Sequence, residues 1–168
     1  HGAFQLCRKL GWYPDIIHAH DWSAALAPVL LRFIQRHNGF QKTASVFTIH
    51  NLGYQGVYGK YNYPATGLDW NFFYAAGFED WDRINFLKAG LTTADMLTTV
   101  SPTYAQEILY PFYGKGMQDI IRENEYKLVG ILNGIDVGLF NPETDKNLAA
   151  RYTAETVDRK VQNKMALQ

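Results

Sequence analysis

The feature that most constrains the fold is an alternation of short apolar runs with longer amphipathic stretches. Apolar runs that are too short for helices are typical of buried strands, and they occupy residues 15–20, 44–49, 96–100 and 128–132. Apolar residues recur at helical spacing between these runs, over residues 22–37 and 81–93 and from residue 102 onward. Because continuous apolar strands alternating with helices pack as a parallel sheet covered on both faces, we predict an α/β fold of that kind.

Several helix boundaries carry their own signals. Gly11 is expected to close a helix over residues 1–10, and Pro28 is expected to kink the helix over residues 22–37. Ser101 and Pro102 are typical of an N-cap followed by the first helical position. The polar tail, residues 153–168, is predicted to be helical.

The charge balance excludes some classes of partner. Lysine plus arginine total 16, as do aspartate plus glutamate, and no basic block is present, so we expect neither a nucleic-acid nor a membrane partner. No apolar run is long enough to span a bilayer. Cys7 is the single cysteine and has no internal partner for a disulfide, which fits a reducing compartment.

Polar residues come directly after each predicted strand. They are His18-Ala19-His20-Asp21, His50-Asn51, Ser101 and Asn133-Gly134-Ile135-Asp136. In an open parallel sheet, ligands bind beyond the carboxyl ends of the strands. The sequence therefore predicts a cleft at one edge of the sheet, lined by side chains from separate strands.

Asp21 has two interpretations. A carboxylate at a strand end can hold or activate a sugar hydroxyl. An aspartate just before a helix is also an ordinary N-cap. The spacing leaves the choice open.

The histidines also have more than one interpretation. His18 and His20 point to the same face of a strand, a spacing that suits metal ligands, and His50 is a candidate third ligand. A metal-dependent hydrolase is therefore a hypothesis from another enzyme class, although no carboxylate cluster completes the site. We favour a hydrogen-bonded core histidine for His18 and a ligand-facing one for His50.

Two further segments stay ambiguous. Aromatic residues gather with glycine and asparagine over residues 54–81, which indicates either a sugar-binding surface or a packed irregular loop. Asn133-Gly134 has the pattern of a tight turn, with Asp136 capping the residues after it.

Taken together, the motifs resemble those of the bacterial glycogen synthase and plant starch synthase family, glycosyltransferase family 5. They occur in family order and cover nearly the whole chain: HAHDW at 18–22, FTIHNLGYQG at 47–56, FLKAGL at 86–91, TTVSPTYAQEI at 98–108, ILNGID at 131–136 and NPETD at 141–145.

This resemblance implies a Rossmann-like domain on the acceptor side of a two-domain GT-B enzyme. Such an enzyme transfers glucose from ADP-glucose to the non-reducing end of an α-1,4-glucan with retention, in the bacterial cytoplasm or in a plastid. It needs no metal or other cofactor. By motif, His50 and Asp21 correspond to catalytic residues. The substrate-binding positions implied by the motifs are Asn51, Tyr54, Gln55 and Asn133.

The resemblance also has departures. Ser23 replaces a histidine that many relatives carry, and the family's KxGGLGD loop is expected before His1. Residues 1–152 are then part of the N-terminal domain, and residues 153–168 are a helix leading to the interdomain hinge, with the donor domain absent.

These departures have functional consequences. We expect residues 1–168 alone to lack transferase activity, because a leaving diphosphate needs electrostatic stabilisation. Self-association through exposed sheet edges is a further expectation. The alternative function is a non-catalytic glucan-binding module.

Overall fold

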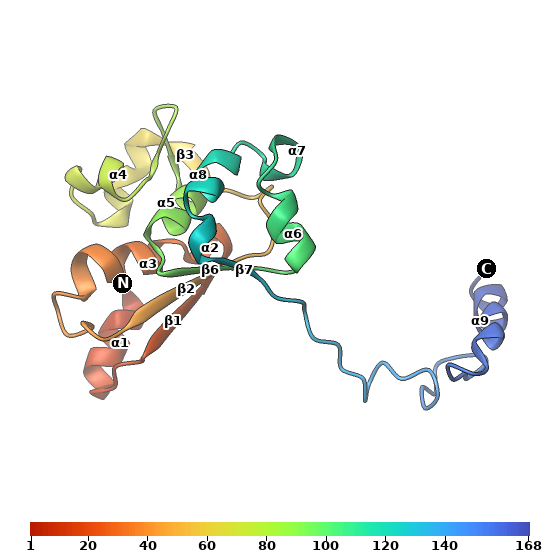
Figure 1. The fold of residues 1–168 in the computed structure, drawn as a ribbon. Coiled ribbons are helices and arrows are strands. Elements are labelled where there is room, and N and C mark those ends of the chain that lie inside the picture. Colours follow the sequence, from red (N-terminus) through yellow and green to blue (C-terminus); the bar gives the residue numbers. More distant parts are fainter. The chain divides into compact units, whose positions relative to one another are not determined.

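The computed structural model describes the backbone of residues 1–168 and every side chain except that of Ala75. The chain divides into two compact units, His1–Leu132 and Asn133–Gln168, each of which has its own internal packing (Figure 1). Among the described residues, no helix combines the length and hydropathy that a membrane span requires.

The first unit begins with the elements that surround its first two strands. These are α1 (Gly2–Leu10), β1 (Ile16–His20), α2 (Asp21–Ala24), α3 (Leu26–Leu30), the π-helical turn η1 (Leu31–Gln35) and β2 (Ala44–Ile49). A middle section comes next, with β3 (Val57–Gly59), the 3-10 helix η2 (Lys60–Thr66), α4 (Asn71–Ala75), β4 (Glu79–Asp80) and β5 (Arg83–Asn85). The remaining elements are α5 (Phe86–Thr93), β6 (Met96–Thr99), α6 (Pro102–Glu107), α7 (Pro111–Gly114), α8 (Gln118–Glu123), η3 (Glu125–Lys127) and β7 (Leu128–Gly130).

The parallel sheet is confirmed. Its strands have the order β1-β2-β6-β7, and every neighbouring pair is parallel. Ala19 lies opposite Phe47, and Phe47 lies opposite Leu97, so that three buried side chains share one face of the sheet. The α/β class predicted from the alternating pattern is therefore correct.

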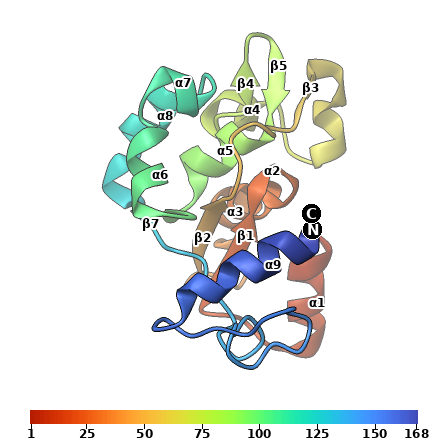
Figure 2. The same cartoon turned by 90° about the vertical axis from the view of Figure 1, so that its right-hand side faces the viewer.

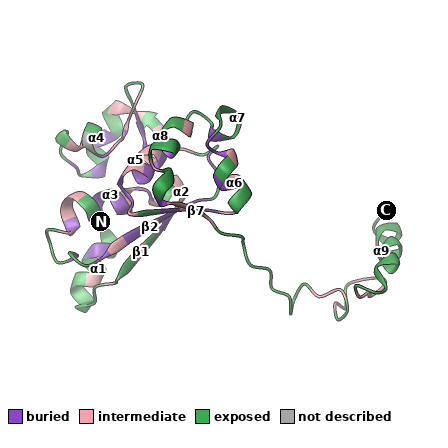
Figure 3. Ribbon diagram, viewed as in Figure 1, coloured by how far each residue is buried: buried purple, intermediate pink, exposed green. Residues whose placement is uncertain are grey.

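Several helices of this unit pack on that buried face. One hydrophobic cluster joins Ala19, Phe47 and Leu97 to residues of α5 and α8, and Figure 3 shows the buried positions concentrated there. On the opposite face, Ile16 and Met96 are 58% and 42% exposed. Within His1–Leu132, helices thus cover one face of the parallel sheet. That helices also cover its second face stays a prediction.

The strand predicted at residues 15–20 was expected to be buried, and this is wrong for most of β1. Only Ala19 of this strand is buried, and Ile17 on the same face is partly buried, because β1 lies at the edge of the sheet. Ile16, His18 and His20 alternate toward the uncovered face and are exposed.

Local signals for helix ends are confirmed. Gly11 closes α1 in the left-handed conformation, at φ 62°, and its N–H donates to the Arg8 carbonyl. The Ser101 hydroxyl caps α6 by accepting from the Tyr104 N–H at 2.8 Å. These caps depend on neighbours in the chain alone, which explains why they could be predicted.

The helix predicted over residues 22–37 is interrupted near Pro28, as expected for a kink. Proline has no N–H to donate to the carbonyl four residues earlier, and α2 ends at that residue, Ala24. The last part is a π-helical turn, in which the Arg36 N–H donates to the Leu31 carbonyl at 3.0 Å.

The helix predicted over residues 81–93 is wrong in its first part. Residues 79–85 form the β4–β5 hairpin, and α5 begins only at Phe86, capped by the Asn85 side chain. Trp81 and Asp82 make the turn at φ 52° and 59°, positions at which glycine or asparagine is the usual signal. Ile84 is buried from the strand rather than from a helix.

The aromatic stretch at residues 54–81 is neither one irregular loop nor one open surface. It contributes β3 and β4 to a second, antiparallel sheet in the order β3-β5-β4, which Figure 2 shows beyond α5 from the parallel sheet. Tyr63, Phe73 and Phe78 are fully buried in a second hydrophobic cluster. Tyr54 and Trp81 are 68% and 89% exposed.

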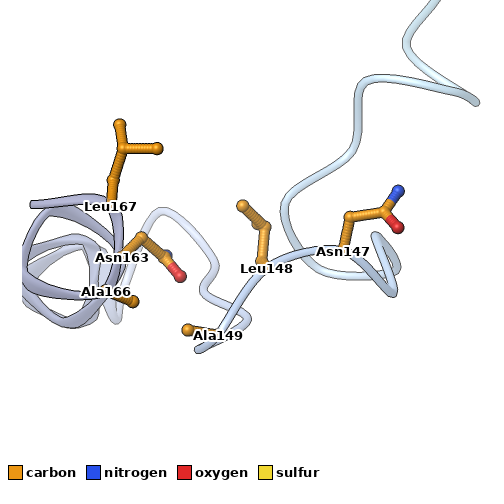
Figure 4. A pocket seen from close by; sticks show the side chains of 6 residues that line it. All are labelled: Asn147, Leu148, Ala149, Asn163, Ala166 and Leu167. Atoms are coloured by element: carbon orange, nitrogen blue, oxygen red, sulfur yellow. The ribbon is translucent and has the colours of Figure 1, made fainter.

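The second unit holds the 3-10 helix η4 (Val157–Arg159) and α9 (Lys160–Leu167), so the predicted helical tail is shorter than expected. The Asn163 side chain exchanges hydrogen bonds with the backbone of Ala150 at 2.8 and 2.7 Å. A pocket of about 270 Å³ lies beside Asn163. Its lining residues, which Figure 4 labels, are aliphatic or amide and include no titratable group: Asn147, Leu148, Ala149, Asn163, Ala166 and Leu167.

Candidate functional site

The carboxylate of Asp21 joins the ends of the first two strands. Its Oδ1 accepts from the His50 N–H at 2.8 Å and from the Asn51 N–H at 3.4 Å. The N-cap position of α2 is His20, and no side chain caps that helix. The N-cap interpretation of Asp21 is therefore wrong, because its carboxylate bonds the turn after β2 instead.

Asp21 also has an unusual backbone conformation. Its φ is 54°, in the left-handed region that costs most L-residues about 1–2 kcal/mol and that aspartate tolerates better. Strained residues of this kind persist where surrounding contacts over-determine them, and they concentrate at functional sites. The bonds to His50 and Asn51 are contacts of this kind.

The structure brings the three histidines together. The rings of His18 and His20 stack with their centroids 4.2 Å apart, and His20 Nδ1 lies 3.0 Å from His50 Nε2. His18 Nε2 is bonded to the Thr48 hydroxyl at 2.6 Å. One ring nitrogen of each of these histidines is therefore bonded to another ring or to a hydroxyl.

This arrangement does not support the metal-site hypothesis. Among the described side chains, no group of three or more histidine, cysteine, aspartate or glutamate residues is arranged to hold a metal ion. His18 is hydrogen-bonded, as predicted, but it lies on the exposed face rather than in the core. Burial lowers the pKa of His18, and repulsion from His20 and His50 lowers it further, so His18 tends to stay neutral beside the other two rings.

A pocket of about 380 Å³ lies next to the His50-Asn51 turn. It is lined by aromatic and loop residues, namely Trp22, Gly53, Tyr54, Gln55, Gly56, Val57 and Tyr58. The Trp22 and Tyr58 rings lie 5.9 Å apart, and Tyr54 is largely exposed. Aromatic faces of this kind can stack against the C–H faces of a sugar ring.

Gly56 allows Trp22 to pack against this loop. A Cβ at position 56 would meet Trp22 Cε3 at 2.3 Å, and Gly56 has φ 63°. Only glycine satisfies both conditions without a shift of the indole ring. The packing of Trp22 against the loop thus explains why residue 56 is glycine.

Gln55 lines the pocket while its side-chain amide bonds within the protein. Its Nε2 donates to the carbonyls of Leu52 and Lys115 at 3.2 and 2.9 Å, and its Oε1 accepts from Asn85 Nδ2 at 2.8 Å. Asn85 is fully buried. In this conformation Gln55 holds the loop against the start of α5.

Asn133 belongs to the second unit, where it is exposed, so its part in the site stays a prediction. The tight turn expected at Asn133-Gly134 is wrong, because the turn forms at residues 137–139. The capping role of Asp136 is confirmed. Its Oδ1 accepts from the Gly138 and Leu139 N–H groups at 3.0 and 2.9 Å.

Two residues beside the site are absent from the catalytic and substrate-binding positions implied by the motifs. Trp22 forms a wall of the pocket, and His20 bonds the ring of His50. The alternating spacing of His18 and His20 is the available signal, but alone it indicates only a metal-ligand pattern. The pairing of β1 with β2, which places His20 beside the end of β2, is needed to interpret it.

Comparisons with known proteins find several relatives of this chain. Residues 1–123 match the family model described as the starch synthase catalytic domain. The chain is 59% identical over its whole length to a glycogen synthase of Treponema denticola, of which it covers 34%. It is 44% identical over 163 residues to a glycogen synthase of Thermodesulfovibrio yellowstonii, covering 96% of this chain and 33% of that relative.

A solved structure is also similar. The catalytic domain of starch synthase IV from Arabidopsis thaliana, bound to ADP and acarbose, matches with a TM-score of 0.82 and 36% identity, covering 99% of this chain and 34% of that one. The chain thus spans about a third of the length of the relatives that it matches. The resemblance drawn from the motifs is confirmed, and the chain belongs to the starch synthase catalytic domain family.

Proposed function

We propose that this chain supplies the acceptor-side part of a retaining glucosyltransferase that elongates an α-1,4-glucan from ADP-glucose. The observation that carries the proposal is the junction at the carboxyl ends of β1 and β2, where Asp21 holds the His50-Asn51 turn. This junction falls within the motifs shared with glycogen synthases. The ADP bound in the Arabidopsis relative supports an ADP-sugar as donor.

In this proposal each residue has a separate task. The ring of His50 faces the transferred glucose, while Asp21 holds the backbone beneath that ring and presents its second carboxylate oxygen to a sugar hydroxyl. Asn51 and Asn133 contribute amide groups near the same glucose. Tyr54 offers an exposed aromatic face to the acceptor chain, and Gln55 supports the loop that carries it.

The proposal also assigns parts of the chain. Residues 1–152 belong to the acceptor-side domain, and residues 153–168 lead toward an interdomain hinge. The groups that neutralise the diphosphate then lie mainly outside these residues. We therefore expect residues 1–168 alone to transfer no glucose, since electrostatic stabilisation of the leaving group is usually the largest catalytic contribution.

The first test measures glucose transfer by the full-length protein. Radiolabelled ADP-glucose and UDP-glucose are offered separately with glycogen, and insoluble product is counted. We expect incorporation from ADP-glucose. Glycogen binding without any incorporation would instead favour a non-catalytic glucan-binding module.

The second test concerns His50. His50→Ala should lower kcat by about 10²-fold or more while the KM for glycogen changes little, because groups near the reacting sugar act mainly on the transition state. His37→Ala is the matched control, since His37 is an exposed histidine at a distance in sequence from every predicted site residue. A change confined to glycogen affinity would contradict the role given to His50.

A further inference from the structure

The hydrogen bond between two imidazole rings at the site restricts which atoms carry protons. His20 Nδ1 lies 3.0 Å from His50 Nε2. A neutral imidazole has one N–H donor and one bare acceptor nitrogen. A hydrogen bond between two such rings therefore needs the proton on one of these facing nitrogens and a lone pair on the other.

This requirement couples the two tautomers. When His20 carries its proton on Nδ1, His50 Nε2 must accept, so the His50 proton resides on Nδ1. When His20 Nδ1 is bare, His50 Nε2 must donate, and His50 Nδ1 becomes an acceptor. His50 Nδ1 is the ring nitrogen that His20 leaves free. Its character as donor or acceptor toward a sugar hydroxyl is thus coupled to the tautomer of His20.

The ring of His20 is itself held in place. It stacks on His18 at 4.2 Å with an interplanar angle of 29°. His18 is anchored through its Nε2 to the Thr48 hydroxyl at 2.6 Å, and that hydroxyl is bonded to the Thr98 hydroxyl at 2.6 Å. These contacts extend across β1, β2 and β6, so the sheet orients His20 before any ligand arrives.

His50 is consequently restrained from two directions. Its backbone N–H donates to Asp21, and its ring is bonded to His20. The first contact fixes the position of the residue, and the second restrains the plane of the ring and couples its tautomer to that of His20. A ring held in this way loses less entropy when it meets a substrate.

We propose that His20 is a positioning residue, which sets the tautomer and orientation of His50 for contact with the transferred sugar. This proposal rests on the proposed function of His50, and it extends that function to a neighbour that never has to touch the substrate. The proposal also gives His18 and His20 of β1 a structural role other than metal binding.

The test compares two substitutions of His20 in the full-length protein. His20→Phe keeps a flat ring for stacking on His18 but removes the nitrogen that bonds His50. His20→Asn places a side-chain amide about where Nδ1 was, so that it can still bond His50. Ile16→Ala is the matched control, on the same face of the same strand and 58% exposed.

The first readout is the ring ¹⁵N spectrum of His50, assigned by its loss in His50→Ala. We expect one protonated and one bare nitrogen signal in the wild type, in His20→Asn and in Ile16→Ala. His20→Phe should give signals averaged between the two tautomers. A His50 spectrum that is unchanged in His20→Phe would overturn the proposal, as would averaged tautomers in the wild type.

The second readout is steady-state kinetics of glucose transfer. We expect His20→Phe to lower kcat by about tenfold, the scale of one lost hydrogen bond, with the KM for glycogen within about twofold, and His20→Asn to recover most of the loss. Equal losses in both variants would contradict the role. If the spectra change as expected but no variant or wild type transfers glucose, the positioning stands and the proposed function fails. If the protein transfers glucose but the His50 spectrum does not change in His20→Phe, the proposed function stands and the positioning role of His20 fails.

Discussion

The carboxylate of Asp21 provides the most direct test of how the site is built. Asp21→Ala removes the acceptor of two backbone N–H bonds, at 2.8 and 3.4 Å, and leaves a residue at φ 54°. Hydrogen bonds to charged groups contribute about 1.5–3 kcal/mol, but one of these is long and both are exposed, so we take about 2 kcal/mol for the pair. Alanine in the left-handed region adds about 1 kcal/mol of strain.

Amide hydrogen exchange measures this local free energy without requiring a two-state unfolding transition. A loss of about 2–3 kcal/mol corresponds to exchange at the His50 amide that is about 30-fold to 150-fold faster. Asp21→Gly loses the same bonds but relieves the strain, so its effect should be smaller than that of alanine by about fivefold. Asp21→Asn keeps an oxygen acceptor and tolerates the backbone, so its effect should be about twofold.

The order of the three variants matters more than any single value. If glycine exchanged as fast as alanine, the positive φ would contribute no strain. If asparagine exchanged as fast as alanine, the oxygen of residue 21 would not be what holds the turn. If none of the variants differed from the wild type, the contact between Asp21 and the His50-Asn51 turn would be absent in solution.

Two further predictions concern the sheet and its helices. Gly90→Ala should lower the melting temperature by several degrees despite the better helix propensity of alanine, because a Cβ there would lie 2.8 Å from Phe47 Cζ and overpacking costs about 1–3 kcal/mol. Burial alone would raise the pKa of Asp95, but hydrogen bonds from Ser45 and the Arg36 guanidinium outweigh it and hold this pKa below its ordinary value of 3.8. Asp95 thus contributes stability that is complete above that ordinary value and is lost as the pH falls through the lowered one. In urea titrations, Asp95→Asn should therefore lose less stability than the wild type on acidification into that range, and an equal loss would contradict the ion-pair explanation.

Much of the fold could be predicted from the sequence because its signals are local. The strand expected at residues 44–49 is observed as β2 with the same bounds, and the caps at Gly11 and Ser101 are present. The β4–β5 hairpin was missed because Ile84 and Leu87 imitate helical spacing. In addition, Trp81 and Asp82 adopt positive φ values although neither is glycine or asparagine, so the sequence carries no signal for the turn.

The candidate site was predictable only in outline. Polar residues follow the predicted parallel strands, and this pattern correctly indicated that Asp21, His50 and Asn51 would lie together. The pattern could not distinguish a cap from a contact with the next strand, because both roles use the same residue type at the same position. It also could not identify His20 as the partner of the His50 ring.

The sequence alone determined the class of the fold, the family motifs and the bounds of the parallel strands to within one or two residues, since these depend on periodicity and on signals within a few residues. Only the tertiary structure decided which strand stands at the edge, which face of the sheet is covered, and where the carboxylate of Asp21 points. Those outcomes depend on contacts between residues about thirty positions apart, such as Asp21 with His50 and His20 with His50. Such contacts form when strands pair, and strand pairing is set by the packing of the whole unit rather than by any local pattern.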